Sequence, residues 1–220
     1  MKKNKMTHTI IPAFSKIIYE TKLTYSDNEL NDMINYVSKL KYSSSIGYYT
    51  KEHKDKKELY TNASITKSIL EDNFFKDLKD KIMKEFNTFK NDTMCYTNNN
   101  FEITTSWVSK TEKDETSFYH NHHNCMYSGI FYLSAVDGTG DLSFENFDNY
   151  RFKLNPSVHN VYNSKELKFN VKNNTLIFFP SECHHRVLSH KSDKIRYAIA
   201  FNLIPKGKLG IEGEDSFLVL

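Results

Sequence analysis

The second half of the chain alternates between apolar and polar residues in short segments, which is the pattern of strands in a sheet. Turn residues separate these segments, among them Asp137-Gly138 and Lys172-Asn173-Asn174, which predict hairpin-type turns. The pattern predicts eight strands: Phe101–Ser109, Ser117–His122, Met126–Ala135, Gly140–Glu145, Glu166–Val171, Thr175–Phe179, Arg186–His190 and Ile195–Ile204. Eight strands without an intervening helix indicate a sandwich or a jelly roll.

The first hundred residues instead predict an extended arm followed by two helices. Residues 10–24 alternate weakly and contain Pro12, as expected of an edge strand or an arm. Ser26 and Glu29 have the spacing of a capping box, so a helix is expected to begin there and to run to about residue 41. A second helix is predicted over 71–91 from apolar residues three or four positions apart, namely Phe75, Leu78, Ile82, Phe86 and Phe89.

Two long polar stretches, 42–64 and 146–165, predict loops. Long loops in compact domains often act as lids or binding loops, and we expect residues 146–165 to lie at one mouth of the barrel. We therefore predict one mainly β (α+β) domain over 1–220. It consists of an arm and supporting helices over 1–99, a jelly-roll core over 100–204 and a tail over 205–220.

Charge and composition exclude several classes of protein. Thirty basic and 27 acidic residues, mixed along the chain, give a net charge of +3, which is too little for a nucleic-acid-binding surface. No apolar run approaches the length of a membrane span, and residues 7–14 lack the apolar segment of a secretory signal. Three cysteines without a Cys-x-x-Cys motif predict no disulfide framework and favour a reducing cytoplasm.

Histidines are concentrated in two short segments, 118–123 and 183–186, which hold five of the nine in the chain. Side chains alternate along a strand, so His120 and His122 leave the backbone on one face while His123 points away. Such a pair, with a third donor from the second segment, is the arrangement of a catalytic metal site with open positions. Cys125 and Cys183 lie nearby and admit a thiolate ligand or a Cys-His nucleophile, although a small apolar filler is the simpler interpretation.

The last predicted strand places an arginine among small residues. One face holds Arg196, Ala198, Ala200 and Asn202, and the other, which we expect to pack beneath the helices, holds Ile195, Tyr197, Ile199 and Phe201. A buried guanidinium keeps its charge and needs an acidic partner. That partner is either a ligand carboxylate bound by the guanidinium fork or a buried Asp or Glu of the protein. His185 lies eleven residues earlier, at the other end of a predicted hairpin.

Several motifs together resemble the Fe(II)- and 2-oxoglutarate-dependent oxygenases of the double-stranded β-helix (jelly-roll) fold. The resemblance covers roughly residues 101–204 and is greatest to a small bacterial and phage group. Its motifs are Trp107, His120-Asn121-His122, Ser128-Gly129-Ile130-Phe131-Tyr132-Leu133, Phe179-Pro180-Ser181, His185 and Arg196. The chain is also similar to the prolyl hydroxylases in Phe131-Tyr132-Leu133 and Arg196-Tyr197-Ala198-Ile199.

The resemblance implies a dioxygenase that uses Fe(II), O2 and 2-oxoglutarate, hydroxylates an unidentified substrate and releases succinate and CO2. It implies that His120 and His185 bind the metal, and only the family pattern selects His185 over its neighbour His184. It also implies that Arg196 binds the distal carboxylate of 2-oxoglutarate, helped by the Tyr132 hydroxyl. Trp107 and the two long loops are expected to line or cover the substrate pocket.

One position departs from the family pattern, since most members carry Asp or Glu two residues after the first histidine. Here that residue is His122, and we expect it to be the third ligand. Three neutral imidazoles leave the metal with one more positive charge, which would weaken Fe(II) retention, favour another metal or change the oxidation. The alternative third ligand is a carboxylate from Glu145, Asp141 or Glu182.

Two other functions stay open at this point. One is a cupin-type three-histidine metalloenzyme that needs no keto acid, and the other is a non-catalytic jelly-roll binding module. Arg196 discriminates between the cupin-type enzyme and the oxygenase, because the cupin-type enzyme assigns it no cosubstrate. Anaerobic titration with Fe(II) and 2-oxoglutarate discriminates between the binding module and the oxygenase. The sequence identifies neither the small-molecule or peptide substrate nor the oligomeric state.

Overall fold

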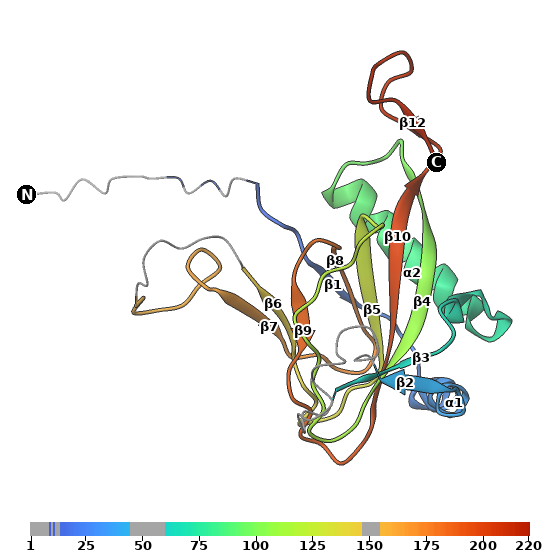
Figure 1. Cartoon of the computed structure of the whole chain (residues 1–220), viewed down its shortest axis with the longest axis vertical. Helices are drawn as coiled ribbons and strands as arrows, with labels where there is room; N and C mark the ends of the chain where they lie inside the picture. Colours follow the sequence, from blue (N-terminus) through green and yellow to red (C-terminus); the bar gives the residue numbers. More distant parts are fainter. Residues whose placement is uncertain (1–8, 10, 12–13, 45–59, 147–154) are drawn as a thin grey trace, which may run out of the picture.

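The protein is built mainly of antiparallel strands, which the computed structural model describes over residues 9, 11, 14–44, 60–146 and 155–220 (Figure 1). The large sheet has seven strands in the order β1-β8-β5-β10-β4-β3-β2, and the small sheet has three in the order β7-β6-β9. The large-sheet strands are β1 (Tyr19–Lys22), β2 (Tyr42–Ser44), β3 (Asn62–Ser64), β4 (Asn100–Thr111), β5 (Tyr127–Ser134), β8 (Thr175–Pro180) and β10 (Arg196–Lys206). The small-sheet strands are β6 (Leu142–Glu145), β7 (Glu166–Phe169) and β9 (His185–Val187).

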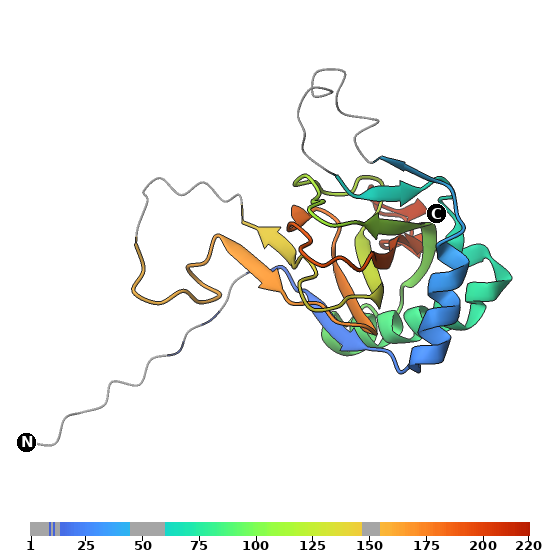
Figure 2. The same ribbon diagram turned by 90° about the horizontal axis from the view of Figure 1, so that it is seen from below.

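The two faces of the large sheet pack against different layers. Its inner face meets the small sheet in a core that contains Ile130, Phe179 and Ala198 from the large sheet and Leu142 and Phe144 from the small one. This is a jelly roll, as the strand pattern predicts. The two sheets enclose the region between them, and the small sheet extends away from the helices (Figure 2).

Two helices cover the outer face of the large sheet, α1 (Asp27–Val37) and α2 (Lys76–Thr88). The predicted capping box is confirmed, because the Ser26 hydroxyl accepts from the amide of Glu29 while the Glu29 carboxylate accepts from the amide of Ser26. Aromatic side chains fill the space between helices and sheet, with Phe86 packed edge-on against Phe101, Tyr127 and Phe178. The predicted alternation of β10 is confirmed as well, since its bulky residues lie in this outer core and its small ones face inward.

The predicted second helix is less regular than expected. It is preceded by two short 3-10 turns, Ile69–Glu71 and Asn73–Phe75, and followed by a π-helical turn, Phe89–Thr93. The predicted loop over 42–64 contains β2 and β3, which extend the large sheet beyond β4. Residues 45–59 of that loop, and 147–154 of the predicted loop over 146–165, lie outside the described residues.

Three predicted connections are wrong in topology. Asp137-Gly138 and Lys172-Asn173-Asn174 do form turns, but each carries the chain between the two sheets, β5 to β6 and β7 to β8, and so closes no hairpin. Likewise β9 pairs with β6 while β10 pairs with β4 and β5, so His185 and Arg196 do not share a hairpin. In a jelly roll successive strands alternate between sheets, and local turn chemistry does not encode which sheet comes next.

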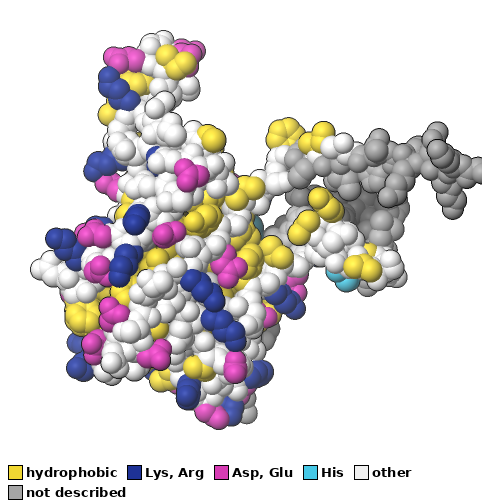
Figure 3. Space-filling view, turned by 180° about the vertical axis from the view of Figure 1, so that it is seen from behind, with side chains coloured by type: hydrophobic (Ala, Val, Ile, Leu, Met, Phe, Trp, Pro, Cys, Tyr) yellow, Lys and Arg dark blue, Asp and Glu magenta, His cyan; other side chains and the backbone are white. Residues whose placement is uncertain are grey.

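Charged residues of both signs are interspersed over the face shown in Figure 3, without a patch of one sign. The C-terminal hairpin of β11 (Lys208–Leu209) and β12 (Leu218–Val219) projects beyond the end of the large sheet (Figure 1). No helix among the described residues has the length and apolar character needed to cross a membrane.

Candidate metal and cosubstrate site

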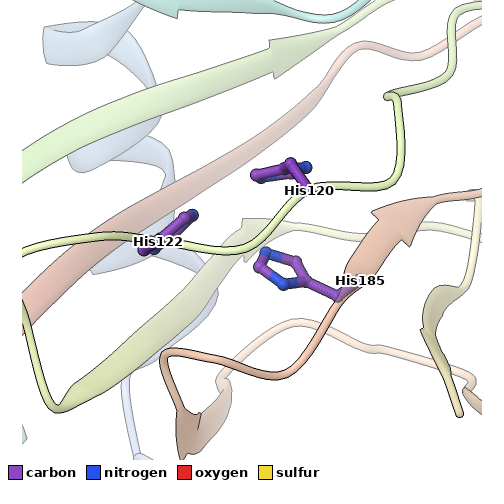
Figure 4. A group of neighbouring side chains, drawn as sticks. All are labelled: His120, His122 and His185. Atoms are coloured by element: carbon purple, nitrogen blue, oxygen red, sulfur yellow. The ribbon is translucent and has the colours of Figure 1, made fainter. Parts of the chain in front are cut away.

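Three histidines from distant parts of the chain converge between the sheets (Figure 4). His120 and His122 lie on the segment that joins β4 to β5, and His185 begins β9. Each offers one ring nitrogen, and these three nitrogens all lie within 4.8 Å of one another. His185, rather than His184, belongs to this group, and no cysteine or carboxylate joins it within the described part of the chain.

Backbone hydrogen bonds hold this segment in place, although residues 117–122 do not form the predicted strand. His120 and His185 exchange both of their backbone hydrogen bonds, at 3.0 and 2.9 Å, in an isolated bridge. The next contact is different, because the amide of His122 donates to the carbonyl of Ser181 at 2.9 Å. The segment therefore crosses from the edge of the small sheet toward the large one, and the pairing is too short to be a strand.

The hydrogen bonds of the three rings leave the converging nitrogens free to bind a metal. The Nδ1 atoms of His120 and His185 lie 2.9 Å from the carbonyl oxygens of Phe118 and Cys183, respectively. Because a carbonyl only accepts, each Nδ1 carries the proton and each Nε2 keeps its lone pair. This arrangement, in which a second group fixes the tautomer and the orientation of the ring, is typical of histidines that bind metal.

His122 is fixed by a side chain instead of a backbone carbonyl. Its Nδ1 lies 2.7 Å from Oδ1 of Asn202, which also accepts from the Ser128 hydroxyl at 2.9 Å. The amide of Asn202 cannot turn over without losing a contact, because its Nδ2 donates to Thr105 Oγ1 at 3.0 Å. Sequence reasoning placed Asn202 on the inward face of β10 but gave it no role.

Burial keeps these imidazoles neutral at physiological pH. It lowers the pKa of His122 to about 4, with a further contribution from His120. Burial likewise lowers the pKa of His120 and holds that of His185 well below its ordinary value, where the two neighbouring rings add to the effect. Three neutral imidazoles are the protonation state that a metal ion requires.

A second polar group lies deeper in the same interior, around Arg196. This residue is 1% exposed, and its Nη1 donates to the carbonyl of Gly140 at 3.0 Å. Its Nε and Nη2, and the hydroxyl of Tyr132, are buried without a hydrogen-bond partner among the described residues. No Asp or Glu forms an ion pair with Arg196 within the same residues. Burial lowers the pKa of Arg196 and raises that of Tyr132 to about 12.

Such a set of unsatisfied donors is costly unless a ligand satisfies it. The guanidinium carbon lies 5.3 Å from the centre of the Tyr132 ring, so the two residues are neighbours in the interior. Gly140 was not expected to contribute here. A Cβ at its position would lie 1.8 Å from the carbonyl oxygen of Leu188, so only glycine lets the chain pass there and present its carbonyl to Arg196.

A cavity of about 830 Å³ opens onto the three histidines. Trp107 lines it as expected and meets the His122 ring edge-on, with 5.5 Å between centres. Phe118 also lines it and stacks on Tyr60, with 4.0 Å between centres. Inward residues of the large sheet, including Ser109, Ile130 and Ala200, form its floor.

The alternative carboxylate ligands have other contacts. Glu182 is exposed and pairs with Lys16 at 3.6 Å, while Asp141 accepts from Asn170 at 3.1 Å. The Glu145 amide donates to the His184 carbonyl at 3.0 Å, and its carboxylate is outside the group of converging ligand atoms. Cys183 is buried in the inner core, as expected of an apolar filler.

Comparison with protein families matches residues 105–202 to a family described as "Putative 2OG-Fe(II) oxygenase". The matched range contains the three histidines, Tyr132 and Arg196. A search of curated protein sequences finds no match.

Several solved structures share the fold. The chain is similar to a viral collagen prolyl hydroxylase, vCPH from Paramecium Bursaria Chlorella virus-1, solved with 2OG, with 17% identity, a TM-score of 0.53 and coverage of 84% of this chain and 94% of that chain. It is also similar to HygX from Streptomyces hygroscopicus, solved with nickel, 2-oxoglutarate and hygromycin B, with 12% identity, a TM-score of 0.57 and coverage of 86% and 82%. A prolyl-4-hydroxylase from Pseudomonas putida has 12% identity, a TM-score of 0.54 and coverage of 84% and 91%.

Proposed function

We propose that this chain is an Fe(II)- and 2-oxoglutarate-dependent oxygenase and that it hydroxylates an organic substrate at a three-histidine metal centre. His120, His122 and His185 hold the metal, and Arg196 with Tyr132 holds the distal carboxylate of 2-oxoglutarate. The observation that carries this proposal is the presence of both groups in one interior, three converging imidazoles and an arginine with unsatisfied donors.

The three imidazoles suit a divalent metal, because their Nδ1 protons are engaged elsewhere and their Nε2 lone pairs converge. Three protein ligands leave coordination positions open for a cosubstrate and a gas. When bound, the iron supplies the reaction of O2 with 2-oxoglutarate, which yields succinate, CO2 and an oxygen atom for the substrate.

The remaining residues bind, orient and exclude water. The side-on edge of the Arg196 guanidinium, Nε with Nη2, is free to receive both oxygens of a carboxylate. Ala198 and Ala200 have small side chains on the inward face between Arg196 and the histidines, which leaves room for the carbon chain of the keto acid. Apolar residues of the cavity, Ile130, Leu142 and Phe179, keep bulk water from the reacting groups.

The cavity has the size of sites that accept a small molecule or a single side chain of a peptide. Both kinds of substrate are represented among the similar structures, hygromycin B in one complex and collagen in the name of another.

Anaerobic titration with Fe(II) and 2-oxoglutarate tests the proposal. We expect a visible metal-to-ligand charge-transfer band with the wild-type protein, and succinate on exposure to O2. Arg196→Ala should still bind metal but lose both signals, because the keto acid loses its charged anchor. Arg186→Ala is the matched control, since that arginine packs on Tyr119, pairs with Glu166 and does not itself line the cavity, and it should keep both signals. Metal binding without 2-oxoglutarate-dependent signals would favour the cupin-type enzyme.

A further inference from the structure

The region around Arg196 contains one more unsatisfied group, the hydroxyl of Thr111. Thr111 is 0% exposed, and its Oγ1 has no hydrogen-bond partner among the described residues. Four side-chain donor positions there are therefore both buried and unpaired: Thr111 Oγ1, Tyr132 Oη, Arg196 Nε and Arg196 Nη2.

Strand register places the three residues on one face. Arg196 of β10 lies directly opposite Thr111 of β4, so the two side chains leave the sheet on the same side. Tyr132 of β5 lies opposite Ala198, the next inward residue of β10. The three side chains thus lie on one face near the same end of the sheet, and the cavity wall reaches Ser109, the inward neighbour of Thr111.

The number of donors matches one chemical group. An ionised carboxylate accepts about four hydrogen bonds through its two oxygens. The Gly140 carbonyl accepts from Nη1, which leaves Nε and Nη2 on the other edge of the guanidinium without a partner. That edge supplies two N–H groups in a fork, and the hydroxyls of Tyr132 and Thr111 supply one each.

We infer that Thr111 is a third binding residue for the distal carboxylate of the keto acid, an inference that rests on the proposed function. Its hydroxyl donates to the carboxylate oxygen that faces β4, while Tyr132 donates from the side of β5. The pairing of β4 with β10 places Thr111 opposite Arg196 and so brings its hydroxyl to the anion.

The test measures ligand affinity in place of turnover. Mn(II)-loaded wild-type protein, Thr111→Val, Thr111→Ser and Thr104→Val are titrated anaerobically with 2-oxoglutarate and with 2-oxobutyrate, which lacks the distal carboxylate. Thr104 lies on the same strand but is exposed, which makes it the matched control. Thermal unfolding of each metal-free protein is measured in parallel.

We expect Thr111→Val to weaken 2-oxoglutarate binding by about 10-fold or more, the usual effect of losing a hydrogen bond to a charged group. Binding of 2-oxobutyrate should not change, and the Ser and Thr104 variants should bind 2-oxoglutarate like the wild type. The metal-free Val variant should unfold at the same temperature or a higher one, because its lost hydroxyl had no partner. If Val prevents folding, Thr111→Ala against Thr111→Ser provides the same comparison.

Wild-type affinity in Thr111→Val, or equal weakening of both keto acids, would overturn the role of Thr111 and leave the proposed function standing. A large loss of metal-free stability would also overturn it, since the hydroxyl would then be structural. Failure of the wild-type protein to bind 2-oxoglutarate would instead refute the proposed function itself.

Discussion

Asn202 shows how a single side chain can determine the state of the metal site. His122 stands where a carboxylate is usual, and its neighbour is a neutral amide whose orientation is set by Thr105. The amide oxygen keeps the proton on Nδ1, so Nε2 faces His120 and His185 with its lone pair. The ring is thus prepared as a ligand before any metal arrives.

Asn202→Val should therefore weaken metal binding by about 10- to 100-fold, the usual cost of losing a group that orients a ligand. Competition with a chelator measures the affinity of each variant for Mn(II) or Fe(II). Asn202→Asp keeps an acceptor at the same place and serves as the control, with affinity no lower than that of the wild type. Equal affinity of the Val variant and the wild type would show that His122 needs no such support.

For single residues, the sequence predicted the side-chain orientations that depend on alternation along one strand. The inward positions of Tyr132 and Arg196 followed from period two on a single strand. The hydrogen bond of Asn202 with His122 and the position of Thr111 opposite Arg196 bring together residues 80 and 85 positions apart, and only the register between strands determines this.

The connection from β5 to β6 is the element that links packing to ligand binding. It passes Leu188 so closely that residue 140 has no room for a Cβ, and its carbonyl holds the Arg196 guanidinium. A substitution in this connection can therefore displace the carbonyl that holds Arg196, even though it replaces none of the side chains of the cosubstrate site.

Gly140→Ala is expected to lower the free energy of unfolding by about 1–3 kcal/mol, as overpacking commonly does. It should also weaken 2-oxoglutarate binding, because the displaced carbonyl no longer aligns Arg196. Urea unfolding and calorimetry measure the two effects. Ser189→Ala changes the facing segment without adding volume and should alter neither quantity, whereas unchanged affinity in Gly140→Ala would separate the connection from the site.

Elements were predicted where the pattern within them is strong. The cap of α1, the alternation of β10 and the jelly-roll class all follow from local spacing. The segment over 117–122 failed as a strand because its alternation reflects two ligands on one side, while its backbone pairs with the small sheet at a single bridge. The three predicted hairpin connections failed because the partners of each strand are determined by packing over the whole chain.

Across the whole molecule, the acid sensitivity of the metal-free protein should report on the buried histidines. Burial lowers the pKa of His122 from 6.5 to about 4, so between these values the unfolded chain takes up protons more readily than the folded one. Above pH 6.5 the ring is neutral in both states and has no effect. Below it, protonation stabilises only the unfolded chain, so the free energy of unfolding falls as pH drops from about 6.5 toward 4. His122 alone should account for a loss on the order of 3 kcal/mol.

Urea unfolding at several pH values checks this. His122→Asn removes the titrating ring, so its free energy of unfolding should depend less steeply on pH over the same interval. Identical slopes in the two proteins would mean that His122 is not the group responsible. Saturating metal should raise the free energy of unfolding across this interval without removing its pH dependence, because the metal binds only the neutral rings of the folded state.

The opposite faces of β10 have a consequence for how this protein can change. Residues that hold the molecule together, such as Phe201, point toward the helices, and residues that meet ligands, such as Ala200, point the other way from the very next position. Substituting only the inward-facing residues of β10 should change substrate selectivity and leave thermal stability almost unchanged. The same strand backbone can therefore accept different substrate selectivities through substitutions at one inward position after another.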